Sequence, residues 1–520
     1  MLCERNYWES QFHIVKGREV ALILENEKLK AKLKLREQQL FGRKTEKGNQ
    51  KNCLNKSETN ESSSKRNRGQ QAGTEGHGRI IQNNLPVVVE ECGLDDNDAK
   101  CKKCGLPYAL HPTTEDSEII EIEVKPYRRR IKRKKYIPTC TCPCNKGIII
   151  APGINKLIPK GMFGISFWVQ IILTKYCFQQ PLTRYLYELT MYGLNISAGT
   201  ITDGIKRIAI LFERVNQEII IKNKSEHHWH ADETGWMVFI KIENKKGHHW
   251  WLWVFQSETT IVFKIAPSRG AKVVKEYFGE DANGIINADR YIVYKTLLES
   301  GRFLLAYCWA HVRRDFIRFA TSWQELEVWA FVWIERIGNL YYLNEQRIKY
   351  DDQTEEFNNA DEQLRKAVTE FHTEFKTQLS DKKIHPACKK ILLSLQKHWS
   401  GLTLFVDYSW IPMDNNPAER TLRGPVVGRK NYYGSGSLWS AEFTAGMFTI
   451  LHTLELWGIN PRLWLTKYLQ TCADNNSKPP ETLNRFLPWT MTREELIGFG
   501  SSIEKIPKNK PVVLVRKKQL

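Results

Sequence analysis

The sequence predicts a multidomain α/β protein, and three observations support this fold class. The chain has 520 residues, which is enough for several domains. Strand patterns alternate with helical patterns between residues 223 and 440, whereas the segments next to this region are mainly helical. A polar stretch and a cysteine cluster follow the first helix. We therefore predict six segments, at residues 1–47, 48–79, 80–150, 151–222, 223–440 and 441–520.

The composition indicates a soluble protein with a polyanionic partner. The formal net charge is +19 and the pI is about 9.3, which favours nucleic acid as a partner over a generic basic protein. No apolar run reaches the roughly 18 residues of a membrane span. The N-terminus, MLCERNYWESQ, has no signal-peptide core. We expect no membrane contact and a cytoplasmic location, where the 12 cysteines are thiols or metal ligands rather than disulfides.

Residues 1–47 predict a coiled-coil helix. One core position of its heptad holds Val15, Leu22, Leu29 and Arg36, and the other holds Glu19, Asn26, Leu33 and Leu40. An asparagine in the core, such as Asn26, favours a parallel dimer in one register. An ordinary amphipathic helix is the alternative. Residues 48–79 read as a basic, Gly/Ser-rich linker, which either lies along DNA or is a solvated tether.

Residues 80–150 predict a small zinc-binding module. CKKCG and TCTCPC supply five cysteines, and a two-residue spacing in a tight turn suits tetrahedral Zn²⁺. We assign a structural Zn²⁺ to Cys101, Cys104, Cys140 and Cys142, with Cys144 and Cys92 as spare candidates. A set of reduced free thiols is the alternative.

Residues 151–222 predict a helical region with helix-turn-helix-like spacing. One helix ends at a turn near Gly193, and a second helix begins with a cap near Ser197. Such hairpins read DNA in some proteins and serve as packing units in others, and the sequence leaves both roles open. Residues 441–520 are predicted to form a C-terminal helical element with a basic tail.

Residues 223–440 predict a ribonuclease-H-like α/β domain. Three antiparallel strands, HHWHADETGWMVFIKI, HHWWLWVFQ and TIVFKIAPS, precede the helix AKVVKEYFG, the buried strand GIINADRYIVY and the strand-helix segment RFLLAYCWAHVRRDF. This order places Asp232 within the first strand and Asp289 at the end of the fourth strand, beside the first. Residues 317–405 read as a helical insertion, so a third carboxylate has to come from a later helix.

Glu419 is the candidate for the third carboxylate. In MDNNPAERTLRGPVVGRKNYYGSGS we expect Asn416 as the N-cap, Pro417 at the first helical position and Glu419 at the third. A glutamate there either completes the cap and pairs with Arg423, or ligates metal, and the two roles are compatible. Three convergent carboxylates can hold two Mg²⁺ ions for phosphoryl transfer on DNA, with Mn²⁺ as the alternative ion.

These motifs together resemble a bacterial transposase of the insertion-sequence-66 family over nearly the whole chain. HADETGW, INADRYIVY, CWAHVRRDF and DNNPAERTLRGPVVGRKNYYGSGS resemble its core motifs in order, EKLKAKLKLREQQLFGRKTEK its N-terminal zipper, and CKKCG with TCTC its zinc-binding region. The resemblance implies a catalytic Asp-Asp-Glu triad of Asp232, Asp289 and Glu419. It also implies DNA cleavage and strand transfer at terminal inverted repeats by a homodimer or higher multimer. The implied location is the bacterial nucleoid, and accessory proteins of the same element are further partners.

Basic residues near the triad are the predicted DNA contacts, because phosphate can approach a cluster of acids only if cations balance it. They lie in HVRRDF and after Glu419, and comprise Arg313, Arg314, Arg420, Arg423, Arg429 and Lys430. The chain departs from the family at Arg290, where glycine is usual. We expect this cation to pair with the active-site acids or to reach DNA. The alternative functions are a ribonuclease-H-like nuclease without strand transfer and an inactive DNA-binding relative.

Overall fold

The computed structural model describes residues 125–136, 148–241 and 247–502, together with residues 103, 106 and 507 and scattered residues between 12 and 30. The chain divides into two compact units, one made of residues 1–42 and 126–520 and the other of residues 43–125. The predicted linker at 48–79 lies outside the described residues, as do the predicted zinc ligands Cys101, Cys104, Cys140 and Cys142.

A five-stranded mixed sheet forms the centre of the larger unit, with the strand order β5-β4-β3-β6-β7. Strand β4 (His249–Gln256) runs antiparallel to its neighbours β3 (His228–Met237) and β5 (Ile261–Ala266). Strands β6 (Gly284–Ala288) and β7 (Phe303–Tyr307) run parallel to β3. All five residues of β6 are buried, as is typical of a parallel strand that is covered on both faces.

Helices connect the strands in the predicted order. Helix α6 (Ala271–Phe278) joins β5 to β6, the short helices α7 (Ile292–Lys295) and η3 (Leu298–Ser300) join β6 to β7, and α8 (Trp309–Ser322) follows β7. The mixed α/β class predicted from the sequence is therefore confirmed.

The first strand is shorter than its sequence pattern suggested. Strand β3 ends at Met237, and Val238 instead forms a parallel bridge to Ser435 in the glycine-serine turn after α13. Gly434 makes this close approach possible: its φ is +146°, and a side chain there would overlap the carbonyl oxygen of Met237. The turn thus anchors the end of α13 to the sheet.

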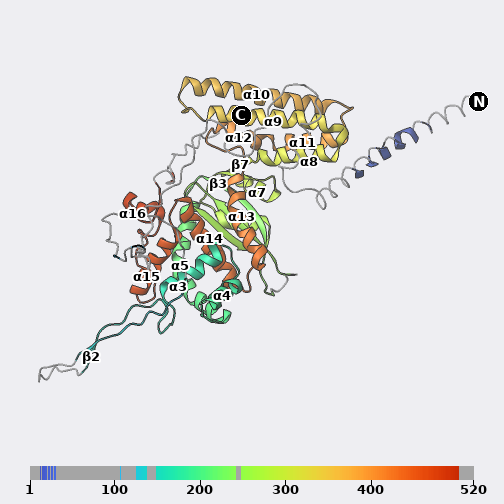
Figure 1. Cartoon of the computed structure of the whole chain (residues 1–520). Coiled ribbons are helices and arrows are strands. Elements are labelled where there is room, and N and C mark those ends of the chain that lie inside the picture. Colours follow the sequence, from blue (N-terminus) through green and yellow to red (C-terminus); the bar gives the residue numbers. More distant parts are fainter. Residues whose placement is uncertain are drawn as a thin grey trace, which may run out of the picture. The chain divides into compact units, whose positions relative to one another are not determined.

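Helices from both halves of the chain cover the sheet. Helices α5 (Ala198–Lys224) and α14 (Leu438–Leu456) pack against each other and against β5, and α13 (Asn416–Tyr432) packs against β3 and β4 (Figure 1). Helix α14 also satisfies the outer edge of β5. The backbone N–H groups of Ile261 and Phe263 donate to Thr453 Oγ1 at 3.1 Å and Thr449 Oγ1 at 2.9 Å. These bonds cap donors that an edge strand would otherwise leave unpaired.

The region at 151–222 contains the expected turn between two helices and contributes to the central core. Helix α4 (Leu182–Met191) ends at a turn where Gly193 has a φ of +76°, and Ser197 Oγ caps α5 by accepting the N–H of Thr200 at 3.1 Å. One face of α5 is buried in the same hydrophobic cluster as the sheet, which favours the packing role for this hairpin. Further elements of this cluster are α3 (Ile165–Ile172), the π-helical turn η2 (Leu173–Cys177), α15 (Pro461–Asp474), η5 (Pro488–Thr490) and α16 (Arg493–Gly498).

The stretch predicted as an insertion is helical throughout. Helices η4 (Gln324–Leu326), α9 (Glu327–Arg347), α10 (Glu355–Ser380), α11 (Pro386–Leu402) and α12 (Leu404–Asp407) follow α8 and gather with it (Figure 1). Arg347 is fully buried and joins three of them. Its guanidinium donates to Asp361 Oδ1 at 2.6 Å and to the carbonyl oxygens of Phe405 at 2.6 Å and Val406 at 3.0 Å.

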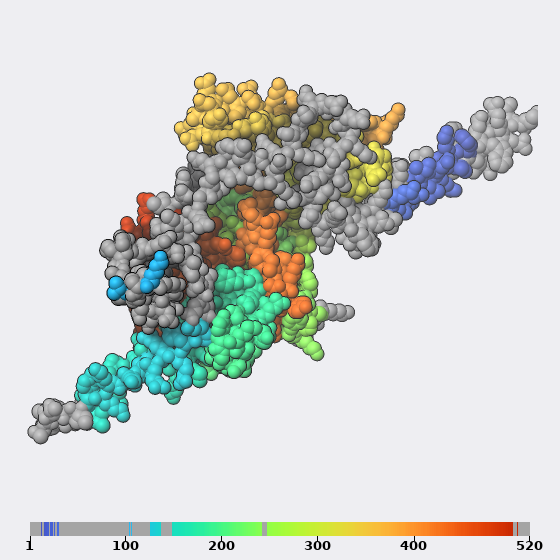
Figure 2. Space-filling model, in the orientation of Figure 1, coloured from blue at the N-terminus to red at the C-terminus, as the bar shows by residue number. Residues whose placement is uncertain are grey.

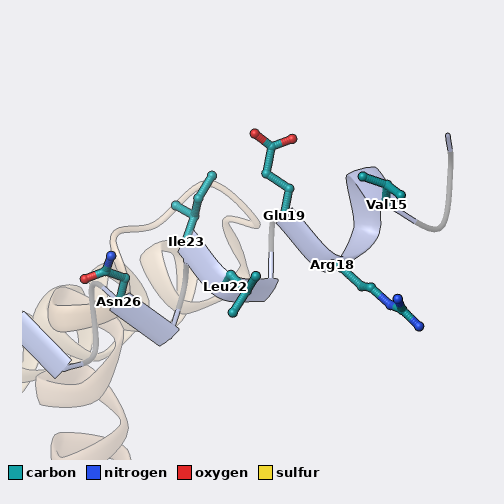
Figure 3. Close-up of a pocket in the computed structure, with 6 residues that line it drawn as sticks. All are labelled: Val15, Arg18, Glu19, Leu22, Ile23 and Asn26. Atoms are coloured by element: carbon teal, nitrogen blue, oxygen red, sulfur yellow. The ribbon is translucent and has the colours of Figure 1, made fainter.

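The described residues between 12 and 30 are helical and exposed. Val15, Leu22 and Leu29, from one predicted core position, are 60, 64 and 56% exposed, and Figure 3 shows Leu22, Ile23 and Asn26 along this helix. A single chain leaves these apolar side chains uncovered, so the pairing of two helices stays a prediction. Among the residues that the structure describes, no helix is both long and apolar enough to cross a membrane.

A two-stranded antiparallel hairpin of β1 (Lys135–Tyr136) and β2 (Ile149–Ile150) precedes the main body in sequence. Eight of the twelve residues from 125 to 136 are Lys or Arg, and all of residues 125–136 are exposed. This part of the chain therefore has a strongly positive surface.

Candidate active site

Two of the predicted carboxylates come from neighbouring parallel strands. Asp232 lies within β3, and Asp289 directly follows the last residue of β6. The strands pair His230 with Asn287, so each acid lies two residues further along its own strand, next to the other. The chain fixes Asp289 at the strand end, because its Oδ1 accepts the backbone N–H of Tyr291 at 2.9 Å.

The third predicted carboxylate lies in the first turn of α13. Glu419 Oε2 accepts a hydrogen bond from Arg314 Nη2 at 2.9 Å, and Oε1 lies 3.6 Å from His311 Nε2. Both partners belong to α8, so the glutamate pairs with this helix rather than with Arg423 one turn along its own helix. Within the described part of the chain, Glu419 Oε1 is buried and has no hydrogen-bond partner.

The start of α13 differs by one residue from the prediction. The helix begins at Asn416 with Asn415 in the cap position, so Glu419 is its fourth residue and not its third. The side chain of Asn415 does not cap the helix, because both ends of its amide bind β3: Oδ1 lies 3.0 Å from His230 Nδ1, and Nδ2 donates to the carbonyl oxygen of Ala231 at 2.8 Å. Asp414 Oδ1 accepts the N–H of Asn416 at 2.9 Å in its place. The prediction of Asn416 as the N-cap was wrong because strand β3 binds the neighbouring amide, a contact that helix signals do not contain.

The acids interact electrostatically. Burial, together with the nearby acids Glu233, Asp289 and Glu419, raises the pKa of Asp232 to about 8, and burial is the largest cause. The backbone N–H of Glu233, which donates to Asp232 Oδ1 at 2.8 Å, acts in the opposite direction. The structure thus brings Asp289 and Glu419 within electrostatic range of Asp232. Half-buried carboxylates, one with a buried oxygen that accepts no hydrogen bond, fit a divalent cation such as Mg²⁺, whose preferred ligands are carboxylate oxygens.

A fourth acid, Glu233, was not singled out from the sequence. Its side chain is 1% exposed and accepts hydrogen bonds from Tyr294 Oη at 2.6 Å and from Arg269 Nε at 2.8 Å. The Arg269 guanidinium lies between two rings, 4.6 Å from the centroid of Trp251 and 4.0 Å from that of Tyr291. Adjacent residues of a strand point to opposite faces of the sheet. In the ADET motif, Glu233 therefore points away from Asp232 and requires hydrogen-bond donors of its own, which was the sequence signal for this residue.

A second set of potential metal ligands shares Glu419. One ligand atom each of Cys308, His311 and Glu419 lies within 4.8 Å of the others. The spacing of CWAH, which places Cys308 at the cap of α8 and His311 one turn inside it, was the sequence signal for this pair. Burial raises the pKa of the Cys308 thiol, and its Sγ accepts the N–H of Asn415 at 3.2 Å. The protonated thiol is therefore a poorer ligand than the carboxylates.

The six predicted DNA-binding residues divide into three groups. Arg420, Arg423 and Lys430 are exposed on α13, which reaches the surface in Figure 2, where it is orange. Arg313 and Arg314 are half-buried on α8, and Arg314 is engaged by Glu419. Arg429 Nη1 donates to Thr234 Oγ1 at 3.1 Å and to the carbonyl oxygen of Gly235. Helix α13 continues to Tyr432, so Arg429 and Lys430 lie in its last turn and not in a loop after it.

Arg290 takes neither of the two expected roles. Its Nη2 pairs with Asp315 Oδ2, and its Nη1 donates to Ser394 Oγ at 3.1 Å. These partners lie on α8 and α11, so the extra cation is balanced by a carboxylate outside the predicted triad.

Comparison with known proteins identifies the family. A sequence model described as "Transposase IS66 family" matches residues 160–443, more than half of the chain. The chain belongs to the IS66 family of transposases. It is also similar to two proteins of Sinorhizobium fredii (strain NBRC 101917 / NGR234), called uncharacterized protein y4jD and uncharacterized protein y4hP. The first is 24% identical over 426 residues, which cover 78% of this chain and 80% of that protein. The second is 24% identical over 393 residues, which cover 70% of this chain and 69% of that protein.

The matched region extends from just before α3 into α14 and contains Asp232, Asp289 and Glu419. The resemblance inferred from the sequence motifs is thereby confirmed. Membership of the IS66 family supports a transposase-type function, and with it the processing of DNA.

Proposed function

We propose that this IS66-family chain is a DNA transposase that cuts and joins DNA strands with the Asp-Asp-Glu triad Asp232, Asp289 and Glu419. One observation carries the proposal: Asp289 at the end of β6 and Glu419 on α13 lie close enough to Asp232 on β3 to raise its pKa, and a buried oxygen of Glu419 accepts no hydrogen bond among the described residues. The strand order β5-β4-β3-β6-β7, with three antiparallel strands followed by two parallel ones, supports a ribonuclease-H-like core.

The triad would hold two Mg²⁺ ions, with Mn²⁺ as the alternative. When bound, such ions activate the attacking oxygen and stabilise the leaving oxygen in phosphoryl transfer. The residues of the chain keep the ligands in place. The N–H groups of Glu233 and Tyr291 orient Asp232 and Asp289, and Arg314 holds Glu419 by Oε2 while Oε1 stays unpaired. Of the two ligand sets, the three carboxylates suit a hard cation better than the set that includes the Cys308 thiol.

DNA would approach along α13. Arg420, Arg423 and Lys430 are its exposed cations, and the formal net charge of +19 favours a polyanionic ligand. Arg429 is bonded to strand β3 and is better assigned to the fold. Arg314 is bonded to Glu419 of the triad, where a cation would offset the charge of the acids and of an incoming phosphate. Arg313 precedes it on α8 and is proposed to contact phosphate as well.

The N-terminal part would serve assembly and zinc binding. Residues 1–47 are proposed to pair two chains in a parallel coiled coil, which suits an enzyme that brings two DNA ends together. Removing them should weaken self-association, as measured by sedimentation. Cys101, Cys104, Cys140 and Cys142 are proposed to bind one structural Zn²⁺, and elemental analysis of protein purified under reducing conditions should find one equivalent. Terminal inverted repeats, accessory proteins of the element and a nucleoid location follow from this function.

The test uses duplexes that carry the inverted repeats flanking the gene of this protein. We expect Asp232→Asn, Asp289→Asn and Glu419→Gln each to reduce Mg²⁺-dependent cleavage by at least about 100-fold with little change in DNA binding. The exposed Asp281 provides the control variant, Asp281→Asn, which should cleave normally. Normal cleavage by a triad variant would remove that residue from the proposal.

Joined products distinguish the alternatives. Cleavage together with strand transfer into a second duplex supports a transposase. Cleavage without joining supports a ribonuclease-H-like nuclease, and DNA binding with neither activity supports an inactive relative.

A further inference from the structure

The loop Pro412–Asn415, which leads into α13, is built into the sheet more tightly than a connection requires. Met413 and Asn415 are 4% and 1% exposed. The proposed chemistry uses none of the four residues of this loop. Three sets of hydrogen bonds nevertheless tie it to strand β3, to strand β6 and to the start of α8, and each of these elements carries or adjoins a residue of the candidate site.

The first set ties the loop to β3. Asn415 Nδ2 donates to the carbonyl oxygen of Ala231 at 2.8 Å, and Asn415 Oδ1 lies 3.0 Å from His230 Nδ1. Since Oδ1 of an amide is an acceptor, His230 is the donor in this bond and carries a proton on Nδ1. Ala231 directly precedes Asp232, so the amide of Asn415 is fixed beside the first acid.

The second set ties the loop to β6. Asn287 Nδ2 donates to the carbonyl oxygens of Pro412 at 2.8 Å and Asp414 at 3.3 Å. Its Oδ1 accepts from His228 Nε2 at 2.8 Å. Asn287 lies two residues before Asp289, and it is opposite His230 in the strand register. Asn415 of the loop and Asn287 of β6 therefore connect the loop to the two strands that carry or adjoin the first two acids.

The third set ties the loop to the start of α8. The N–H of Asn415 donates to Cys308 Sγ at 3.2 Å, and the N–H of Trp309 donates to the carbonyl oxygen of Met413 at 2.9 Å. Helix α8 supplies Arg314, the partner of Glu419. The loop is thus fixed to every element that contributes to the candidate site.

We propose that Asn287 and Asn415 are positioning residues that set the place of Glu419 relative to Asp232 and Asp289. The inference rests on the proposed function, because it concerns the same three acids. The N–H of Glu419 donates to the carbonyl oxygen of Asn415 at 3.3 Å, so the first turn of α13 joins the acid to the loop. A small shift of the loop moves the third carboxylate, and divalent cations that require near-ideal oxygen geometry bind less tightly to a displaced set.

The decisive variant keeps the shape of the side chain but replaces its amide donor by a carboxyl oxygen, and the control carries the same change of group. Asn287→Asp retains an oxygen for His228 but offers no N–H to Pro412 and Asp414. Asn415→Ala removes both bonds to β3. The control is Asn223→Asp: Asn223 is also buried, and its Nδ2 also donates to backbone carbonyls, those of Phe255 at 3.1 Å and Thr260 at 3.3 Å. It makes no hydrogen bond to the loop.

Mn²⁺ binding to the DNA-free full-length protein is measured by electron paramagnetic resonance, beside thermal unfolding and cleavage kinetics. We expect Asn287→Asp and Asn415→Ala to weaken Mn²⁺ binding about 10–100-fold, to lower kcat, and to leave the KM for DNA unchanged. The control should lose thermal stability but keep its Mn²⁺ affinity. The inference would be overturned if folded Asn287→Asp bound Mn²⁺ as tightly as the wild type. It would also be overturned if the control Asn223→Asp lost as much Mn²⁺ affinity as Asn287→Asp. If Asn415→Ala does not fold, Asn287→Asp alone decides.

The triad variants separate this result from the proposed function. If Asp232→Asn and Glu419→Gln lose Mn²⁺ binding but Asn287→Asp does not, the triad stands and the positioning role fails. If the triad variants bind Mn²⁺ like the wild type, both the triad and the positioning role are refuted.

Discussion

Replacing Asp232 by asparagine should make the metal-free protein more stable at alkaline pH. Burial and, to a smaller extent, the three neighbouring acids together raise the pKa of this carboxyl from 3.8 to about 8. Between these two pH values the folded state binds a proton that the unfolded state has released. The stability that this proton contributes is full below about pH 4 and is lost as the pH rises through about 8. The wild type therefore becomes less stable across this range, and a side chain that does not titrate removes this loss.

The size of the effect follows from the change in pKa. A rise from 3.8 to about 8 corresponds to ~6 kcal/mol at the largest. Asp232 is only half-buried, and water screens part of the interaction, so we expect about 3 kcal/mol. Asparagine matches the size of the protonated acid, and its Oδ1 can still accept the N–H of Glu233. The variant and the wild type should therefore differ little near pH 5 and most above pH 8.

Urea unfolding in the presence of a chelator, between about pH 5 and about pH 8.5, measures this difference. The exposed Asp281 supplies the control, since Asp281→Asn should follow the wild type at every pH. Mn²⁺ should restore the stability of the wild type at pH 8.5 and should stabilise Asp232→Asn less, because the variant lacks one metal ligand. A difference between Asp232→Asn and wild type that does not change with pH would refute the reasoning.

Three further predictions concern DNA binding and packing. The exposed cations of α13 are Arg420, Arg423 and Lys430. Replacing any one of them by alanine should flatten the slope of log DNA affinity against log salt concentration by about 0.9, whereas Arg429→Ala should leave the slope unchanged. Gly204→Ala should destabilise the fold by about 1–3 kcal/mol, because a Cβ would overlap the Trp168 ring, while Gly199→Ala in the same helix should not destabilise it. Arg347→Met should cost about 3–5 kcal/mol in urea unfolding, since it leaves buried acceptors unpaired, and Arg336→Met, which breaks a half-exposed pair, should cost less than about 1 kcal/mol.

Each of these has a result that contradicts it. A flatter salt slope for Arg429→Ala would assign that side chain to DNA. Equal stability of Gly204→Ala and Gly199→Ala would show that α5 is not packed as described. A loss of stability in Arg336→Met as large as that in Arg347→Met would mean that burial of the arginine does not determine how much stability is lost.

The sequence by itself determined the order of strands and helices and the places of Asp232 and Asp289. Strand and helix periods, glycine turns and caps such as Ser197 are local signals, and the structure follows them from β3 to α10. The parallel pairing of β3 with β6, expected from the order of elements, puts the two acids side by side.

Only the tertiary structure decided which side chains those acids and their neighbours meet. Glu419 pairs with Arg314, 105 residues earlier in the chain, and not with Arg423 on its own helix. Asn415 takes the cap position but gives its side chain to β3, 184 residues away. Arg290 pairs with Asp315 on α8. The partner of a buried polar group depends on which surfaces pack together after folding, and local periods contain no information about distant segments that supply the donors and acceptors.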